Sequence, residues 1–338
     1  MLDSFTADRE SQKLPMHLVS VSSIFRNSGV TALVDLLKEY NGLSFIGSDH
    51  FQFKLLESGI YGLIDRLQAG ENLSRNQFKA MRGKALCYAK TRNLPIQILE
   101  EAERVTRLPI AKVSRSWLGF NYRRFKGYSQ AFPDYLKSTT ALFRQLADLN
   151  HRGKVDANSL EQQLAEIFHA YFTSLLQNFK DGLKNPLVLK HLVRPENPLF
   201  PRIMPYAKLL FVARDPRDQY CDIAADKNPG VYIGHKRIDL FIERYRENTE
   251  AARRFFGEAL DNVMEVQFED MVYHYDQTRR QVEVFLGLTD CHCASAKHFD
   301  PKISKANTRL FEKFEKKQDI KAIERELADC LYPFPATD

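Results

Sequence analysis

Two arginines follow an apolar run in the second half of the chain. Residues 208–213 (KLLFVA) lead directly into residues 214–218 (RDPRD), after which residues 219–223 have the character of a helix. A continuous apolar run predicts a strand that is buried on both faces. The polar turn after it then lies at the carboxyl edge of a parallel sheet, where open α/β folds bind ligands. With Arg214 and Arg217 at that edge, the sequence predicts a site for an anion.

A second candidate site lies near the start of the chain. Residues 16–24 read as a strand, residues 25–31 (FRNSGVT) as a turn and residues 32–40 as a helix. A glycine-containing loop before a helix presents unpaired backbone N–H groups and the positive end of a dipole to a phosphate, and Ser28 and Thr31 add hydroxyl donors. The loop lacks the Gly-x-x-x-x-Gly-Lys-Ser/Thr pattern of P-loop kinases and ATPases.

Taken together, the two stretches resemble the PAPS-dependent sulfotransferases. These enzymes transfer a sulfuryl group from 3′-phosphoadenosine 5′-phosphosulfate (PAPS) to a hydroxyl or amine of an acceptor. The resemblance covers roughly residues 15–66 and 184–334. Further segments agree with the family in the same order along the chain: residues 266–272 with 284–288, and residues 299–308 with 320–332.

The resemblance implies one α/β domain over residues 1–338, a three-layer, P-loop-like parallel sheet flanked by helices, with a large helical insertion at about 67–183. It implies PAPS as the donor, adenosine 3′,5′-bisphosphate (PAP) as the product and no required metal. In the family the first loop holds the 5′-phosphosulfate, and the second strand and helix hold the 3′-phosphate. The donor-binding residues that follow are Arg26, Asn27, Ser28, Gly29, Val30, Thr31, Lys190, Arg214, Arg217, Asp222, Lys305 and Arg309.

Three of these cations lie outside the two loops. Lys190 belongs to residues 187–195 (LVLKHLVRP), which resemble the family's strand that ends in a lysine and a nearby proline. Lys305 and Arg309 lie in a polar segment whose counterpart in the resembling enzymes folds over the nucleotide. For any one of these side chains the alternative is a solvated charge at the end of a sheet or in a loop.

The chain departs from the family at the second site. The family commonly has serine eight residues after the arginine that ends the strand, and here that position, counted from Arg214, is Asp222. A carboxylate repels a 3′-phosphate unless an arginine intervenes. Three interpretations stay open: Arg217 compensates, the register differs and uses Cys221 or Tyr220, or the donor is not PAPS.

Sulfuryl transfer needs a base for the acceptor's proton and a cation for the leaving phosphate. The family usually carries lysine or arginine at the position of Asn27. Arg26 stands one position earlier, and its long forked side chain is our candidate for that cation. Residues 44–53 (SFIGSDHFQF) return to the same sheet edge, near the place of a catalytic glutamate in the carbohydrate and protein-tyrosine branches of the family. We predict Asp49 as the base, with His50 second; the alternative is a helix-capping Asp49 beside an exposed His50.

The predicted insertion suggests the acceptor. Within residues 67–183, residues 160–175 place apolar side chains at three- and four-residue spacing, which predicts a helix packed on the core. Residues 114–128 combine the only tryptophan with other aromatic and several basic side chains. Aromatic faces stack on sugars and cations suit an anionic acceptor, so the functional interpretation is a carbohydrate or anionic glycan. The alternative is an aromatic-rich segment packed on its neighbours.

Composition is consistent with a globular enzyme. The chain has 338 residues, 44% of them hydrophobic, and a formal net charge of +6, to which a site for a polyanionic cofactor would contribute. No apolar stretch is long enough to span a membrane and no signal peptide is recognisable, so we expect a cytoplasmic protein. Five cysteines suit a reducing compartment, and residues 291–293 (CHC) are too tightly spaced for a metal knuckle.

Three classes of function therefore remain. The leading hypothesis is a sulfotransferase that acts on a hydroxyl of a carbohydrate or of another small or polymeric acceptor. A nucleotide-dependent kinase would need a lysine in the first loop and an acid for magnesium, and Asp215 between arginines is a poor magnesium ligand. The third hypothesis is a non-catalytic protein that binds polyanions or nucleotides. No recognition helix indicates nucleic acid, and nothing predicts the oligomeric state.

Overall fold

The computed structural model describes eight stretches of the chain and some single positions. The stretches are residues 18–45, 157–177, 185–193, 200–225, 237–257, 260–289, 291–293 and 296–336; the single positions fall within 66–76 and 141–149 and at 195. The predicted bases Asp49 and His50 and much of the predicted insertion at 67–183 lie outside these residues. Along the described part of the chain, no helix is both long and apolar enough to cross a membrane.

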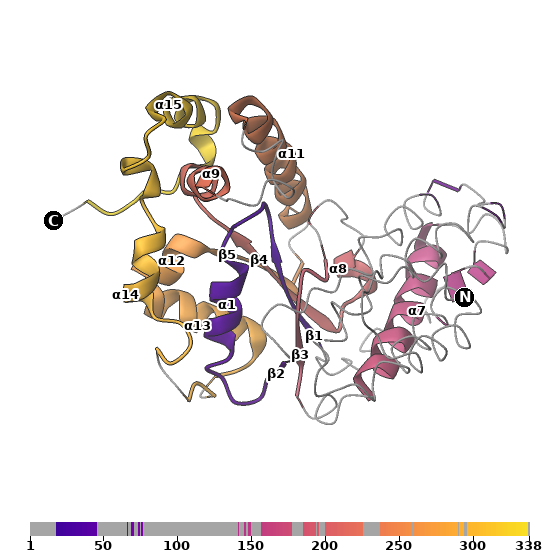
Figure 1. Ribbon diagram of the computed structural model, residues 1–338. Coiled ribbons are helices and arrows are strands. Elements are labelled where there is room, and N and C mark those ends of the chain that lie inside the picture. Colours follow the sequence, from indigo (N-terminus) through magenta and orange to yellow (C-terminus); the bar gives the residue numbers. More distant parts are fainter. Residues whose placement is uncertain are drawn as a thin grey trace, which may run out of the picture.

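Five parallel strands form the centre of the structure (Figure 1), in the order β2-β3-β1-β4-β5. They are β1 (Leu18–Ser23), β2 (Ser44–Phe45), β3 (Leu187–Lys190), β4 (Ala207–Ala213) and β5 (Val263–Gln267). Because β1 is central and pairs with β3 on one side and β4 on the other, residues 169 and 189 positions apart in sequence, Leu187 and Ala207, lie beside Leu18. The carboxyl ends of the three strands therefore meet at one sheet edge. The predicted α/β class with a parallel sheet is confirmed.

One face of the sheet packs on α1 (Val30–Leu37), α12 (Phe268–Tyr273) and α13 (Tyr275–Leu286). Every second residue of a strand points to the same face, and on β4 the residues of this face are Leu210 and Val212. The packing fixes the N-terminus of α1 beside the carboxyl end of β1. The first loop, residues 24–29, spans that gap.

The opposite face of the sheet packs on α11 (Ile238–Phe256), where Phe211 of β4 meets Phe255 edge to face at 4.9 Å. α9 (Pro216–Ala225) and α15 (Lys317–Glu326) share a second apolar core with α11. Figure 1 shows these three helices together beyond the carboxyl ends of β4 and β1. They position the turn that follows β4.

Helix α7 (Ala157–Gln177) confirms the helix that periodicity predicted inside the insertion. Its buried residues include Leu160, Leu164 and Phe168, and Phe168 meets Phe200 of α8 (Phe200–Ile203) at 5.6 Å. After α13 the chain returns to the carboxyl edge of the sheet through α14 (Pro301–Ser304) and the turns around it. Residues 300–336, called the C-terminal segment below, therefore lie over the region where the two predicted loops meet (Figure 1).

Candidate functional site

The first loop brings a left-handed backbone to the start of α1. Asn27 has a φ of 56° and Gly29 a φ of 96°, and no side chain caps the helix that begins at Val30. A Cβ atom on Gly29 would lie 2.5 Å from Cδ2 of Phe268, because the phenylalanine ring packs against the loop. Glycine is thus required both by its backbone conformation and by the close approach of a ring. Since no described side chain caps α1, the N–H groups of its first turn have the arrangement that binds an anion in other proteins.

Ser28 is the polar group of this loop that the protein leaves unsatisfied. Its side chain is only 1% exposed, and its Oγ has no hydrogen-bond partner among the described residues. Burying an unpaired hydroxyl is unfavourable by about 1–3 kcal/mol, so such a group usually has a partner in the working protein. We take Ser28 Oγ as a mark of the place where a ligand oxygen binds.

Lys190 reaches the same place from the neighbouring strand. It is the last residue of β3, its side chain is 6% exposed, and its Nζ lies 3.4 Å from Oγ1 of Thr31 in the first turn of α1. A nearly buried ammonium at the positive end of a helix favours a negative charge between them. The structure thus brings Lys190 together with the predicted residues Ser28, Gly29, Val30 and Thr31.

Arg214 links three segments of the chain at the end of β4. Its side chain is 4% exposed and its guanidinium carbon lies 5.1 Å from the centre of the Phe268 ring. Its Nη1 donates to the carbonyl oxygen of Asn27 at 2.8 Å and also to the carboxylate of Asp222 on α9, and Nη2 donates to the carbonyl oxygen of Asn307 at 2.7 Å. The predicted pair Arg214 and Asp222 is therefore in direct contact, and it joins the first loop to the C-terminal segment.

Arg217, the second arginine of the turn, is directed into a different cluster. Its Nε and Nη2 donate to the two carboxylate oxygens of Asp215 at 3.0 and 2.7 Å, and Nη1 donates to Glu324 at 3.2 Å. Its guanidinium stacks on Phe311 at 3.9 Å. These contacts join α9 to Phe311 and α15 of the C-terminal segment.

The remaining predicted cations lie at the rim. Arg26 is exposed, while its backbone oxygen accepts a hydrogen bond of 2.5 Å from Nε2 of Gln219. Lys305 is exposed, with Nζ 5.8 Å from the centre of the Tyr273 ring. The Arg309 guanidinium pairs with Glu312 at 2.8 Å and also donates to the carbonyl of Pro335. The C-terminal segment therefore meets the predicted site through backbone groups of Asn307 and Arg309.

Three acids without solvent exposure support the turn from below: Asp215, Asp218 and Glu269. Glu269 accepts from the backbone N–H of Asp215 at 2.9 Å, and Asp218 accepts from the backbone N–H of Arg309 at 2.8 Å. Burial raises the pKa of Glu269 to about 7, and burial together with the charge of Asp215 raises that of Asp218 to about 6. Their role is to hold backbone segments in place.

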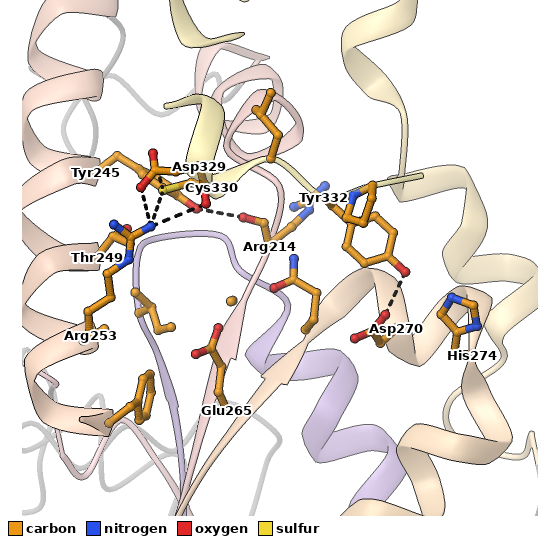
Figure 2. Close-up of a pocket in the computed structure, with 17 residues that line it drawn as sticks. Arg214, Tyr245, Thr249, Arg253, Glu265, Asp270, His274, Asp329, Cys330 and Tyr332 are labelled. Atoms are coloured by element: carbon orange, nitrogen blue, oxygen red, sulfur yellow. Dashed lines mark hydrogen bonds and ion pairs between the residues drawn. The ribbon is translucent and has the colours of Figure 1, made fainter. Parts of the chain in front are cut away.

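A cavity of about 490 Å³ opens beside Arg214, on the α11 face of the sheet. Figure 2 shows its walls: Thr249 and Arg253 on α11, Glu265 of β5, and Tyr332 of the C-terminal segment. Residues 329–333 cross above it, fixed by an ion pair from Asp329 to Arg253 and by a hydrogen bond of 2.7 Å from the hydroxyl of Tyr332 to Asp270. The volume suits part of a small ligand.

This geometry places the first loop, Lys190 and the turn after β4 together at the carboxyl edge of a parallel α/β sheet. Sequence comparison gives the family of the chain. The model of the sulfotransferase family matches residues 28–291, which include the end of the first loop, Lys190, the turn after β4 and β5. The chain therefore belongs to the sulfotransferase family. No curated protein matches the sequence.

Solved sulfotransferase structures also align with the chain over most of its length. The sulfotransferase domain of the curacin biosynthetic pathway is 14% identical, with a TM-score of 0.37, and the alignment covers 95% of this chain and 99% of that one. The sulfotransferase domain of the olefin synthase of Synechococcus PCC 7002 is 15% identical, with a TM-score of 0.38 and coverages of 96% and 98%. Sulfotransferase STF1 of Mycobacterium tuberculosis H37Rv is 10% identical, with a TM-score of 0.38 and coverages of 93% and 77%.

Two residues near the site were not predicted from the sequence. Phe268 touches both Gly29 and Arg214, yet it stands inside an apolar and acidic stretch that gives its ring no distinguishing signal. His191 follows Lys190 with a φ of 54°, and its backbone N–H donates to Val21 at 2.9 Å. His191 therefore directly follows Lys190 at the carboxyl end of β3. The signal in the sequence was the Lys-His pair directly after an apolar run.

Proposed function

We propose that the protein transfers a sulfuryl group from PAPS to a hydroxyl group of an acceptor. The observation that supports this most is the buried Oγ of Ser28 at the start of α1, which has no partner among the described residues, with Lys190 alongside. A hydroxyl, helix N–H groups and an ammonium are the groups that a phosphosulfate needs. Membership of the sulfotransferase family makes sulfuryl transfer the reaction to expect of that site.

In this proposal the first loop and Lys190 bind the 5′-phosphosulfate, and Arg214 binds the 3′-phosphate. Asn27 and Asp222 flank those contacts, and Lys305 and Arg309 add positive charge at the rim. The donor supplies an activated sulfuryl group whose S–O bond to phosphate breaks as the acceptor oxygen attacks in line. Lys190, Arg26 and the N-terminus of α1 stabilise the negative charge that develops on the leaving phosphate.

For the base we propose Asp49 from the sequence, with His50 as the second choice. His191 joins them as a third, because it starts from the same end of β3 as Lys190. The base takes the proton of the acceptor hydroxyl as the new O–S bond forms. The substitutions Asp49→Asn, His50→Ala and His191→Ala separate the three candidates. The variant that lacks the base should lose turnover but keep its affinity for PAP.

The acceptor proposed is a carbohydrate or an anionic glycan, on the basis of the aromatic and basic residues 114–128. We also propose that the protein works in the cytoplasm and without a metal. Across the described part of the chain, no group of three or more potential metal ligands is assembled. Transfer of ³⁵S from labelled PAPS to a panel of neutral and anionic sugars tests the acceptor class.

The donor is tested by thermal unfolding with PAP, AMP or ATP. Ligand at about 100 times its dissociation constant stabilises the fold by about 2.7 kcal/mol, which gives a clear shift of the midpoint. We expect a shift with PAP that exceeds the shifts with AMP and ATP, and we expect Arg214→Ala to weaken PAP far more than AMP. Equal shifts with all three nucleotides would contradict recognition of the 3′-phosphate. No shift with any of them would contradict PAPS as the donor.

A further inference from the structure

Asp222 lies against Arg214 on the second turn of α9, where the family resemblance implies a small hydroxyl residue. On the basis of the proposed function, we propose that Asp222 is an internal counter-anion. The 3′-phosphate of the donor has to displace it from Arg214, and it takes the arginine back when the product nucleotide leaves. Asp222 thereby sets the affinity and the release rate of the nucleotide.

The hydrogen bonds of Arg214 show why displacement is needed. A terminal guanidinium nitrogen carries two hydrogens, and both hydrogens of Nη1 are used, one by Asn27 and one by Asp222. Nε is buried and has no partner within the described structure, so a ligand from solvent reaches only the terminal nitrogens. A forked contact with a phosphate needs two neighbouring N–H groups. It therefore requires the hydrogen that Nη1 now gives to Asp222.

The exposure of the two side chains gives the direction of approach. Arg214 is 4% exposed and Asp222 is 35% exposed, so the carboxylate is the outer member of the pair. A phosphate that approaches from solvent meets this negative charge before it reaches the arginine. Two anions a few ångströms apart repel each other strongly where water is partly excluded. Simultaneous contact of Asp222 and a phosphate with Arg214 is therefore unfavourable.

Arg214 does not depend on Asp222 for its position. The carbonyl oxygens of Asn27 and Asn307 hold it from two other segments, and the Phe268 ring lies under its guanidinium. The arginine can therefore exchange one anion for another without moving. This arrangement is typical of a preorganised site with a replaceable partner.

The other charges of the turn are already neutralised by protein groups. Arg217 is bound to Asp215 and Glu324, and the buried Asp218 accepts backbone N–H groups of Arg309 and Phe311. Among the described contacts of Arg217, none is made with Asp222. Arg214 is thus the cation for which Asp222 and the ligand phosphate compete.

The test measures the affinity of PAP and AMP for the wild type and for Asp222→Asn by isothermal titration. We expect the substitution to tighten PAP about tenfold, which corresponds to about 1.4 kcal/mol of removed competition, and to change AMP less than about twofold. Stopped-flow release of PAP should slow in proportion, because affinity changes within one site appear mainly in the dissociation rate. Asp222→Ser should behave in the same way, whereas Asp222→Glu keeps an anion and should stay near the wild type.

Glu324→Gln is the matched control. It removes one negative charge from the ion pair between Glu324 and Arg217 and leaves the contacts of Arg214 unchanged. The Glu324 side chain is 41% exposed, close to the 35% of Asp222. We expect its PAP affinity to stay at the wild-type value. A similar gain with Glu324→Gln would mean that net charge, not competition, controls binding, and would overturn the proposal.

The outcomes separate the two levels of the argument. If the wild type binds PAP but Asp222→Asn and Asp222→Ser bind it no tighter, the internal counter-anion is refuted and the donor assignment stands. If PAP binds Asp222→Asn and Asp222→Ser but not the wild type, Asp222 excludes the nucleotide from Arg214, which supports the counter-anion. If PAP binds neither the wild type nor folded variants, both the donor assignment and the counter-anion fail.

Discussion

At the first loop Ser28 Oγ is buried and finds no partner in the described part of the chain, whereas at the turn after β4 both hydrogens of Arg214 Nη1 are given to protein acceptors. The two regions face the same sheet edge and are joined by Asn27 and Phe268. The two halves of the proposed site therefore differ in what a ligand would have to do. At Ser28 it would add a missing contact, whereas at Nη1 of Arg214 it would displace a protein acceptor.

The largest effect is expected at Lys190, in the half that contains Ser28. Lys190→Ala removes the ammonium beside Thr31, and a hydrogen bond to a charged group contributes about 1.5–3 kcal/mol. We expect PAP affinity to fall by more than about tenfold, while adenosine 3′-monophosphate, which lacks the 5′-phosphate, binds nearly as before.

The matched control is Lys208→Ala. Lys208 lies near the start of β4, at the opposite edge of the sheet, where its Nζ donates to the carbonyl of Asp261. Isothermal titration of both variants with both nucleotides completes the set. Equal losses for the two nucleotides would place Lys190 outside the 5′-phosphate half.

A pair of glycines tests how closely the two halves are coupled. Gly29 and Gly42 have nearly the same φ, 96° and 97°, but a Cβ at Gly29 meets the Phe268 ring, whereas a Cβ at Gly42 has no described atom within 4 Å. Both alanine variants carry the backbone strain, so their difference isolates the contact with the ring. We expect Gly29→Ala to lower the free energy of unfolding by about 2 kcal/mol more than Gly42→Ala. Urea unfolding gives both values, and equal losses would show that the ring yields.

The smallest effect concerns Ser28, where stability and binding should change in opposite directions. Ser28→Ala removes a buried hydroxyl that has no partner in the described structure, so the ligand-free protein should be unchanged or up to about 1 kcal/mol more stable. PAP affinity should fall about fivefold, because a ligand contact is lost.

Tyr206→Phe is the corresponding control, since the hydroxyl of Tyr206 is also buried without a partner among the described residues but directly precedes β4, at the opposite edge of the sheet. It should raise stability without weakening PAP. Thermal unfolding of both variants, with and without PAP, decides the point. A loss of ligand-free stability in Ser28→Ala would assign that hydroxyl a structural role.

Sequence patterns predicted the sheet, the first loop and the turn after β4 because these depend on local order. The apolar run at residues 208–213 became β4, and the glycine before a helix became the uncapped start of α1. Asp222 was recognised as a departure from the family, but its ion pair with Arg214 requires the spatial relation of a strand end and a helix. The contact from Asn307 was beyond prediction, since it uses a backbone oxygen that every residue type carries. The place of Asp49 and His50 stays a prediction.

The C-terminal segment contributes Asn307 to Arg214 and Tyr332 to Asp215, while the first loop comes from residues 24–29. A nascent chain that has left the ribosome only as far as β5 holds every strand of the sheet but lacks these contacts. Until residues 307–332 emerge, Arg214 and Asp215 stay without their last partners. We therefore expect nucleotide to stabilise arrested chains that include Tyr332 and to leave shorter chains unaffected. The site is then completed late in synthesis.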